Sequence, residues 1–144
     1  MKIAIVGTGY VGLSLAILLS QHHRVVALDI DKEKIKMINN RQSPIDDSLI
    51  DSYFSNNKLN LTATDNKSEA YKDADKIIIC TPTNYNINTG EFDTQTVETV
   101  INDILLENQT ASIFIRSTIP VGFTNRLRKK YKTNKIIFSP EFLR

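Results

Sequence analysis

Residues 2–14 of the chain are KIAIVGTGYVGLS, and this stretch decides the fold. Residues 2–6 form a short apolar run of the β type, and Gly7, Gly9 and Gly12 follow it in the spacing G-x-G-x-x-G. Residues 11–19 predict a helix that is apolar on most faces, as in a helix buried against a sheet. A strand that passes through such a turn into a helix predicts a dinucleotide-binding Rossmann unit.

Each glycine of this turn has its own physical reason. Gly7 permits the tight turn, Gly9 lets the backbone approach a pyrophosphate, and Gly12 lets the helix pack closely on the strand. The free N–H groups at the helix start, at Tyr10 and Val11, and the positive end of the helix dipole favour phosphates. FAD uses the same fingerprint, so FAD remains an alternative ligand, as does a glycine-rich turn without any ligand.

Asp29 lies 22 positions after Gly7 (29 − 7), directly after a second expected strand at 24–28. This spacing is close to the roughly 20 residues that separate the turn from a ribose-binding acid in Rossmann units. A carboxylate there can accept hydrogen bonds from both adenosine ribose hydroxyls and would repel a 2′-phosphate, so we expect NAD rather than NADP. The alternative is that Asp29 caps the following helix, although Asp31 is better placed for that role.

The rest of the chain alternates between apolar runs and helical periods. We expect further strands at 59–63, 76–80, 112–116 and 135–138, and helices at 31–39, 48–54, 68–72, 94–106 and 121–131. Residues 81–93 are polar and predict a loop. The pattern indicates an α/β fold, a Rossmann-like doubly wound parallel sheet of about six strands with helices on both faces.

Composition sets limits on the partners of the chain. The 144 residues, 41% hydrophobic and 24% charged, suit one domain over 1–144, and a net charge of +2 does not point to nucleic acid or membrane. The single cysteine, Cys80, cannot form an internal disulfide, which favours the cytoplasm, and we expect a buried thiol there. We expect no metal site. The chain ends soon after its last expected strand, so we expect it to be the N-terminal part of a longer protein.

Several segments beyond the turn and Asp29 resemble one family. They are SPI at 43–45, TPTNYN at 81–86, FDT at 92–94, VETV at 97–100, STIPVG at 117–122 and SPEFLR at 139–144. On these residues the whole chain resembles the UDP-glucose 6-dehydrogenase family, within the wider UDP-glucose/GDP-mannose dehydrogenases. The last two segments, in this order, are the most specific.

The resemblance implies NAD as cofactor and gives roles to individual residues. It implies that Asp29 and Lys34 contact the adenosine ribose, and that Thr83 contacts NAD. Thr118 matches a threonine that touches NAD and helps to order a catalytic water. Alternatives that involve no ligand are a solvated helix lysine for Lys34, a loop cap for Thr83, and a helix N-cap for Thr118.

The resemblance also implies a substrate site and a reaction. Glu141 matches an active-site acid that positions water or takes a proton, and the sugar nucleotide is lined by the loop of Glu141, Phe142, Leu143 and Arg144. The implied reaction oxidises the C6 alcohol of UDP-glucose to a carboxylate with two NAD, through a cysteine other than Cys80.

The same resemblance implies parts that this chain lacks. A full-length enzyme would add a central helix and a C-terminal substrate domain, and we expect a cytoplasmic homodimer that supplies uronic acid for surface polysaccharide. The isolated domain is expected to bind NAD without turnover. Two alternatives stay open: a sibling enzyme acting on GDP-mannose or a UDP-N-acetylhexosamine, and a stand-alone NAD-binding regulatory module.

Overall fold

The structure is a computed structural model that describes residues 1–87 and 91–141. Its main sheet has six strands, and every neighbouring pair in it is parallel. In spatial order the strands are β3 (Leu61–Thr64), β2 (Arg24–Leu28), β1 (Lys2–Val6), β4 (Lys76–Ile79), β7 (Ser112–Ile115) and β8 (Ile136–Phe138). The chain winds outward from β1 in both directions, which is the doubly wound Rossmann order. The predicted fold class is confirmed.

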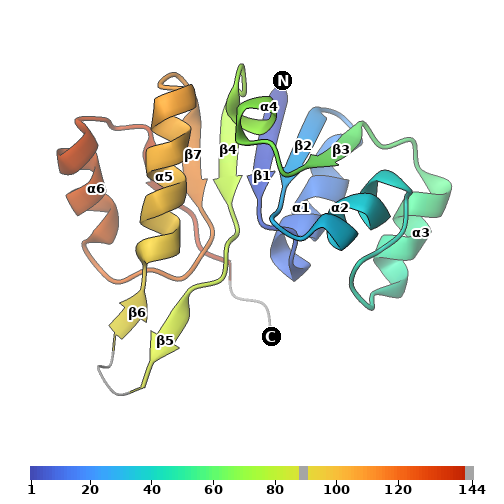
Figure 1. Ribbon diagram of the computed structural model, residues 1–144, viewed down its shortest axis with the longest axis horizontal. Coiled ribbons are helices and arrows are strands. Elements are labelled where there is room, and N and C mark those ends of the chain that lie inside the picture. The colour runs from blue at the N-terminus through green and yellow to red at the C-terminus, as the bar shows by residue number, and fades with distance from the viewer. Residues whose placement is uncertain (88–90, 142–144) are drawn as a thin grey trace.

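Helices cover both faces of this sheet, as Figure 1 shows with α5 on the near side and α1 on the far side. One face packs against α1 (Tyr10–Ser20), α2 (Lys32–Asn39) and α3 (Ser48–Asn56). The other face packs against α4 (Lys67–Tyr71), α5 (Gln95–Glu107) and α6 (Phe123–Tyr131). Among the described residues, no helix has the length and apolar character needed to span a membrane.

The central strands are apolar on both sides because both of their faces are covered. In β1, Ile3 and Ile5 belong to the core beneath α1, whereas Ala4 and Val6 belong to the core beneath α5. The register pairs Val6 with both Leu28 of β2 and Ile79 of β4, so these three strands end at one level of the sheet. Parallel strands that end together bring their following loops to one edge, where ligands of doubly wound sheets bind.

The prediction of a plain loop over 81–93 is wrong. Two short strands, β5 (Asn84–Asn86) and β6 (Glu91–Asp93), pair antiparallel with Tyr85 opposite Phe92. They extend below the carboxyl edge of the main sheet (Figure 1). Each strand has three residues and is rich in asparagine or acid, so neither period-2 patterning nor β-propensity could reveal it.

Candidate cofactor site

The glycine turn between β1 and α1 is built by close backbone contacts. Gly7 has a φ of +92°, a conformation that L side chains rarely adopt, and a Cβ there would lie 3.0 Å from the carbonyl oxygen of Cys80. A Cβ on Gly12 would lie 1.9 Å from the carbonyl oxygen of Gly7. The structure therefore explains two of the three glycines by packing within the protein.

Gly9 has no such internal reason. Its φ of −73° and ψ of −169° are open to any residue, and a Cβ built there meets no described atom within 4 Å. The space in front of Gly9 is open. A glycine that neither the backbone nor the packing demands fits a site where a ligand approaches the main chain closely.

The start of α1 differs from the starts of the next three helices. The side chains of Asp31, Asp47 and Asn66 cap α2, α3 and α4, and each of these helices carries an acidic residue in its first turn. In the part of the chain that the structure describes, α1 has no side-chain cap and no acid in its first turn. Its free N–H groups and positive dipole end are therefore available to an anion, and a pyrophosphate fits both.

The structure places Asp29 against this turn. One carboxylate oxygen, Oδ2, accepts hydrogen bonds from the backbone N–H of Thr8 at 2.8 Å and from its hydroxyl at 2.5 Å. The other, Oδ1, accepts from the N–H of Asp31 at 3.0 Å. Asp31, and not Asp29, caps α2, so the alternative of Asp29 as a helix cap is wrong.

These contacts keep the Asp29 carboxyl ionised. Burial alone would raise its pKa, but hydrogen bonds from the Thr8 hydroxyl and from the N–H groups of Asp31 and Thr8, with the nearby charge of Lys34, outweigh burial. The net pKa of Asp29 therefore lies below its ordinary value. A charged acceptor next to an uncapped helix start suits a ligand that carries both hydroxyls and phosphates.

We expect Thr8→Val to weaken the contact between the glycine turn and Asp29, which follows β2. Valine keeps the shape of Thr8, which is fully buried, but it removes the hydroxyl donor to Asp29. The variant should lose about 1 kcal/mol of unfolding free energy at pH 7, after allowance for the partial exposure of Asp29. Urea titrations of both proteins measure this difference.

The pH dependence of that loss tests its cause. A lowered pKa in the folded state contributes stability at pH values above the pKa of the unfolded chain, and this contribution disappears as the pH falls through the folded value. The gap between Thr8→Val and the parent should therefore shrink as the pH falls below the ordinary Asp29 pKa of 3.8. A gap that persists unchanged at low pH would contradict a role through the carboxylate.

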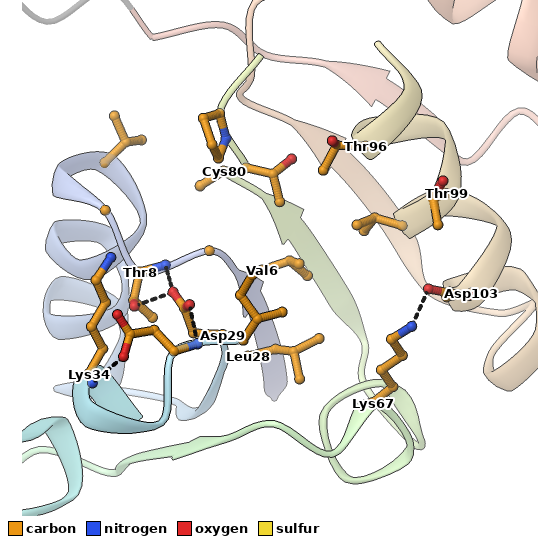
Figure 2. Close-up of a pocket in the computed structure, with 18 of the residues that line it drawn as sticks. Val6, Thr8, Leu28, Asp29, Lys34, Lys67, Cys80, Thr96, Thr99 and Asp103 are labelled. Atoms are coloured by element: carbon orange, nitrogen blue, oxygen red, sulfur yellow. Dashed lines mark hydrogen bonds and ion pairs between the residues drawn. The ribbon is translucent and has the colours of Figure 1, made fainter. Parts of the chain in front are cut away.

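A cleft of about 990 Å³ opens beside the turn and Asp29. This volume is at the upper end of the usual range for small-molecule sites, as a dinucleotide requires. Gly7, Gly9, Tyr10 and Val11 line it from the turn, and Asp29 and Lys34 line it from the β2–α2 segment. Gly12 is buried beneath the turn and does not line the cleft, and its missing Cβ allows the close packing there. Figure 2 shows Asp29 facing Thr8 on one side of the cleft, and Thr96 and Thr99 on the other.

Three other candidate residues lie at the same edge of the sheet but do not line this cleft. Thr83 follows β4 and is half-buried, Thr118 follows β7 and is exposed, and Glu141 follows β8 and is half-buried. The order of these strands puts Thr118 and Glu141 on the opposite side of β1 from Asp29. Phe142, Leu143 and Arg144, the remaining candidates, lie outside the described residues.

Two of these edge residues have defined surroundings. Thr118 does not cap a helix, because α6 begins at Phe123 after Gly122, so that alternative is wrong. Glu141 forms an ion pair with Arg116, whose guanidinium also donates to the Ser139 hydroxyl at 3.0 Å. Arg116 therefore fixes the carboxylate of Glu141 at the end of β8.

Cys80 follows β4 and lines the cleft, where it lies against the glycine turn. Burial raises the pKa of its thiol to about 12, which outweighs the opposite effect of Arg116. The thiol is therefore protonated at neutral pH and is a poor nucleophile.

Sequence reasoning missed several residues that line the cleft. The hydroxyl oxygens of Tyr71 and Thr81 are buried without a hydrogen-bond partner among the described residues, and both residues line the cleft. Helix α5 contributes further lining residues that were missed, namely Gln95, Thr96, Thr99, Val100 and Asp103. Thr8 offered a signal through its place inside the glycine motif, whereas the α4 and α5 residues reach the cleft only through the packing of the fold.

Comparison with known proteins agrees with this geometry. A family model described as "UDP-glucose/GDP-mannose dehydrogenase family, NAD binding domain" matches residues 1–144. The UDP-glucose 6-dehydrogenase of Streptococcus pneumoniae is 52% identical over 144 residues, and that of Campylobacter jejuni is 49% identical over 146 residues. Both alignments include 100% of this chain, which spans only 36% and 37% of the two curated relatives.

A solved structure also resembles this one. The GDP-mannose dehydrogenase of Pseudomonas aeruginosa, crystallised as a ternary complex, superimposes with a TM-score of 0.84 at 29% identity. The match covers 100% of this chain and 37% of that chain. The expected family resemblance and NAD as cofactor are confirmed, and the similarity extends to enzymes with different sugar nucleotides.

Proposed function

Because this chain belongs to the UDP-glucose/GDP-mannose dehydrogenase family and matches its NAD-binding domain, we propose that it is part of an enzyme that oxidises UDP-glucose to UDP-glucuronate. The observation that carries the proposal is the site beside α1. An uncapped helix start and the open space at Gly9 lie next to the ionised carboxylate of Asp29. The curated relatives from Streptococcus pneumoniae and Campylobacter jejuni are both UDP-glucose 6-dehydrogenases, and this supports the choice of sugar nucleotide.

We assign the adenosine half of NAD to the described cleft. The backbone N–H groups of Gly9, Tyr10 and Val11 would bind the pyrophosphate at the dipole end of α1. Asp29, with Lys34 beside it, would bind the adenosine ribose. Its Oδ1 accepts one hydrogen bond within the described protein and has a further lone pair for a ribose hydroxyl. A 2′-phosphate would meet the negative charge of Asp29, so NADP would bind more weakly.

The reacting half of the site would lie toward β7 and β8. When bound, NAD supplies the hydride acceptor. Thr83 and Thr118, on the loops after β4 and β7, would contact its nicotinamide side, and Thr118 would also orient a water. Glu141 has its carboxylate fixed by Arg116 and would take a proton from that water. Phe142, Leu143 and Arg144 would line the sugar-nucleotide pocket.

The proposed reaction balances with two NAD. Oxidation of the C6 alcohol to the aldehyde level releases one hydride and one proton. Oxidation to the carboxylate takes its added oxygen from one water and releases a second hydride and two protons. The nucleophile of the second stage, and the remaining sugar-nucleotide pocket, belong to a central helix and a C-terminal domain of the full-length protein. We propose that this protein is a cytoplasmic homodimer.

A substrate comparison tests this function. The full-length protein should reduce two NAD per UDP-glucose consumed, with little activity on GDP-mannose or UDP-N-acetylmannosamine at the same concentration. Absorbance at 340 nm measures the NADH, and chromatography measures the UDP-glucuronate. Faster oxidation of GDP-mannose would assign the protein to a sibling activity. NAD binding with no oxidation of any of the three sugar nucleotides would favour the regulatory alternative.

A further inference from the structure

Tyr71 is a buried tyrosine at the end of α4 whose hydroxyl has no hydrogen-bond partner among the described residues. Its side chain is fully buried. Its backbone is held in place, because the carbonyl oxygen of Tyr71 accepts a hydrogen bond from the Asn108 side chain at 2.8 Å. Buried polar groups in native proteins almost always have a partner, so an unpaired hydroxyl in a fixed position needs an explanation.

The position of Tyr71 suggests where that partner comes from. Tyr71 lines the cleft together with Leu28, the residue directly before Asp29, and with Val100 of α5. The cleft is bounded there by the ion pair between Lys67 of α4 and Asp103 of α5, at 2.8 Å, which Figure 2 shows opposite the Asp29 side. This part of the cleft therefore has apolar walls at Leu28 and Val100 and, at Tyr71, a buried hydroxyl without a partner among the described residues, next to the residue assigned to the adenosine ribose.

The state of the hydroxyl suits hydrogen-bond donation. Burial, together with the negative charge of Asp103, raises the pKa of Tyr71 above its ordinary value, so the proton stays on the oxygen at any physiological pH. The ring nitrogens of adenine that are not bonded to the sugar are acceptors, and its only donor is the exocyclic amine. A neutral hydroxyl can therefore donate to a ring nitrogen of the base.

We propose that the Tyr71 hydroxyl is a recognition group for the purine base of NAD and donates a hydrogen bond to one of its ring nitrogens. The inference rests on the proposed function in one respect, the placement of the adenosine ribose at Asp29. The base would lie between Leu28 and Val100, and the Lys67–Asp103 ion pair would bound this end of its compartment. Tyr71 then contributes affinity for the adenine half of the cofactor and none for the nicotinamide half.

Tyr71→Phe tests the proposal, because it removes the hydroxyl and keeps the ring. Calorimetry should show NAD binding weakened by about 3- to 10-fold, the effect of one hydrogen bond, and ADP binding weakened by the same factor. The melting temperature of the ligand-free chain should stay unchanged or rise, since an unpaired buried hydroxyl has been removed. Tyr53→Phe is the matched control, because Tyr53 packs on the opposite face of the sheet and should leave both affinities unchanged.

Each other result overturns the proposal. Equal NAD affinity in Tyr71→Phe and the parent removes the hydroxyl from recognition. A lower melting temperature of the ligand-free variant shows that the hydroxyl has a partner within the protein. Weaker NAD binding with unchanged ADP binding places its effect on the nicotinamide half. A parent chain that binds neither NAD nor ADP overturns the cofactor placement as well, so failure of the proposed function is distinguishable.

Discussion

Replacing Gly12 with alanine is expected to destabilise the fold by at least about 3 kcal/mol, at the upper end of the range for overpacking. The added Cβ would lie 1.9 Å from the carbonyl oxygen of Gly7 and 3.2 Å from the Cβ of Cys80. Gly7 cannot move away easily, because its positive φ is fixed by the turn and Cys80 lies directly behind it. Thermal unfolding should show a melting temperature lower by about 10 °C, or no cooperative transition.

Gly9→Ala is the matched control, with the same chemical change three residues earlier. No described atom lies within 4 Å of its added Cβ, so the variant should unfold at the temperature of the parent. It should nevertheless lose most NAD affinity, because the methyl group would occupy the space proposed for the pyrophosphate. A Gly12→Ala variant as stable as the parent would show that α1 does not pack on the turn as closely as the structure has it.

The main sheet could be predicted because its signals are local. The consecutive isoleucines of β4 and the apolar run of β1 are typical of strands covered on both faces. These runs alternate with segments of helical period, which indicates parallel strands connected by helices. The β5–β6 hairpin could not be predicted. Its three-residue strands are held by pairing with each other, and their composition of Asn, Glu and Asp is typical of loops.

The cofactor site likewise has one part that the sequence could predict and one part that it could not. The glycine turn and Asp29 could be placed from spacing alone, because a strand, a turn and the tip of the next strand have nearly fixed geometry. The second role of Asp29, in bracing Thr8, required the structure, since a motif does not show which donors share one carboxylate. Tyr71 of α4 and the residues of α5 that line the cleft were missed, because only long-range packing brings these two helices to the cleft.

Asp29→Ala is expected to weaken NAD binding by about 10- to 100-fold, since a hydrogen bond to a charged group contributes about 1.5–3 kcal/mol. The preference for NAD over NADP should also narrow, because the charge that would repel a 2′-phosphate is gone. The substitution leaves the N–H and hydroxyl of Thr8 without their acceptor, so part of the loss would come from a less ordered turn. Calorimetric titration with each cofactor measures both effects.

Asp29→Asn separates charge from hydrogen bonding. The amide oxygen can still accept from Thr8 and from a ribose hydroxyl, so NAD affinity should fall less than in Asp29→Ala. The repulsion of a 2′-phosphate depends on charge alone, so NADP should gain relative to NAD as much as it does in the alanine variant. If both variants kept the parent's NAD affinity and its preference over NADP, the ribose would have to lie elsewhere. The carboxylate would then serve only to hold the turn between β1 and α1 against β2.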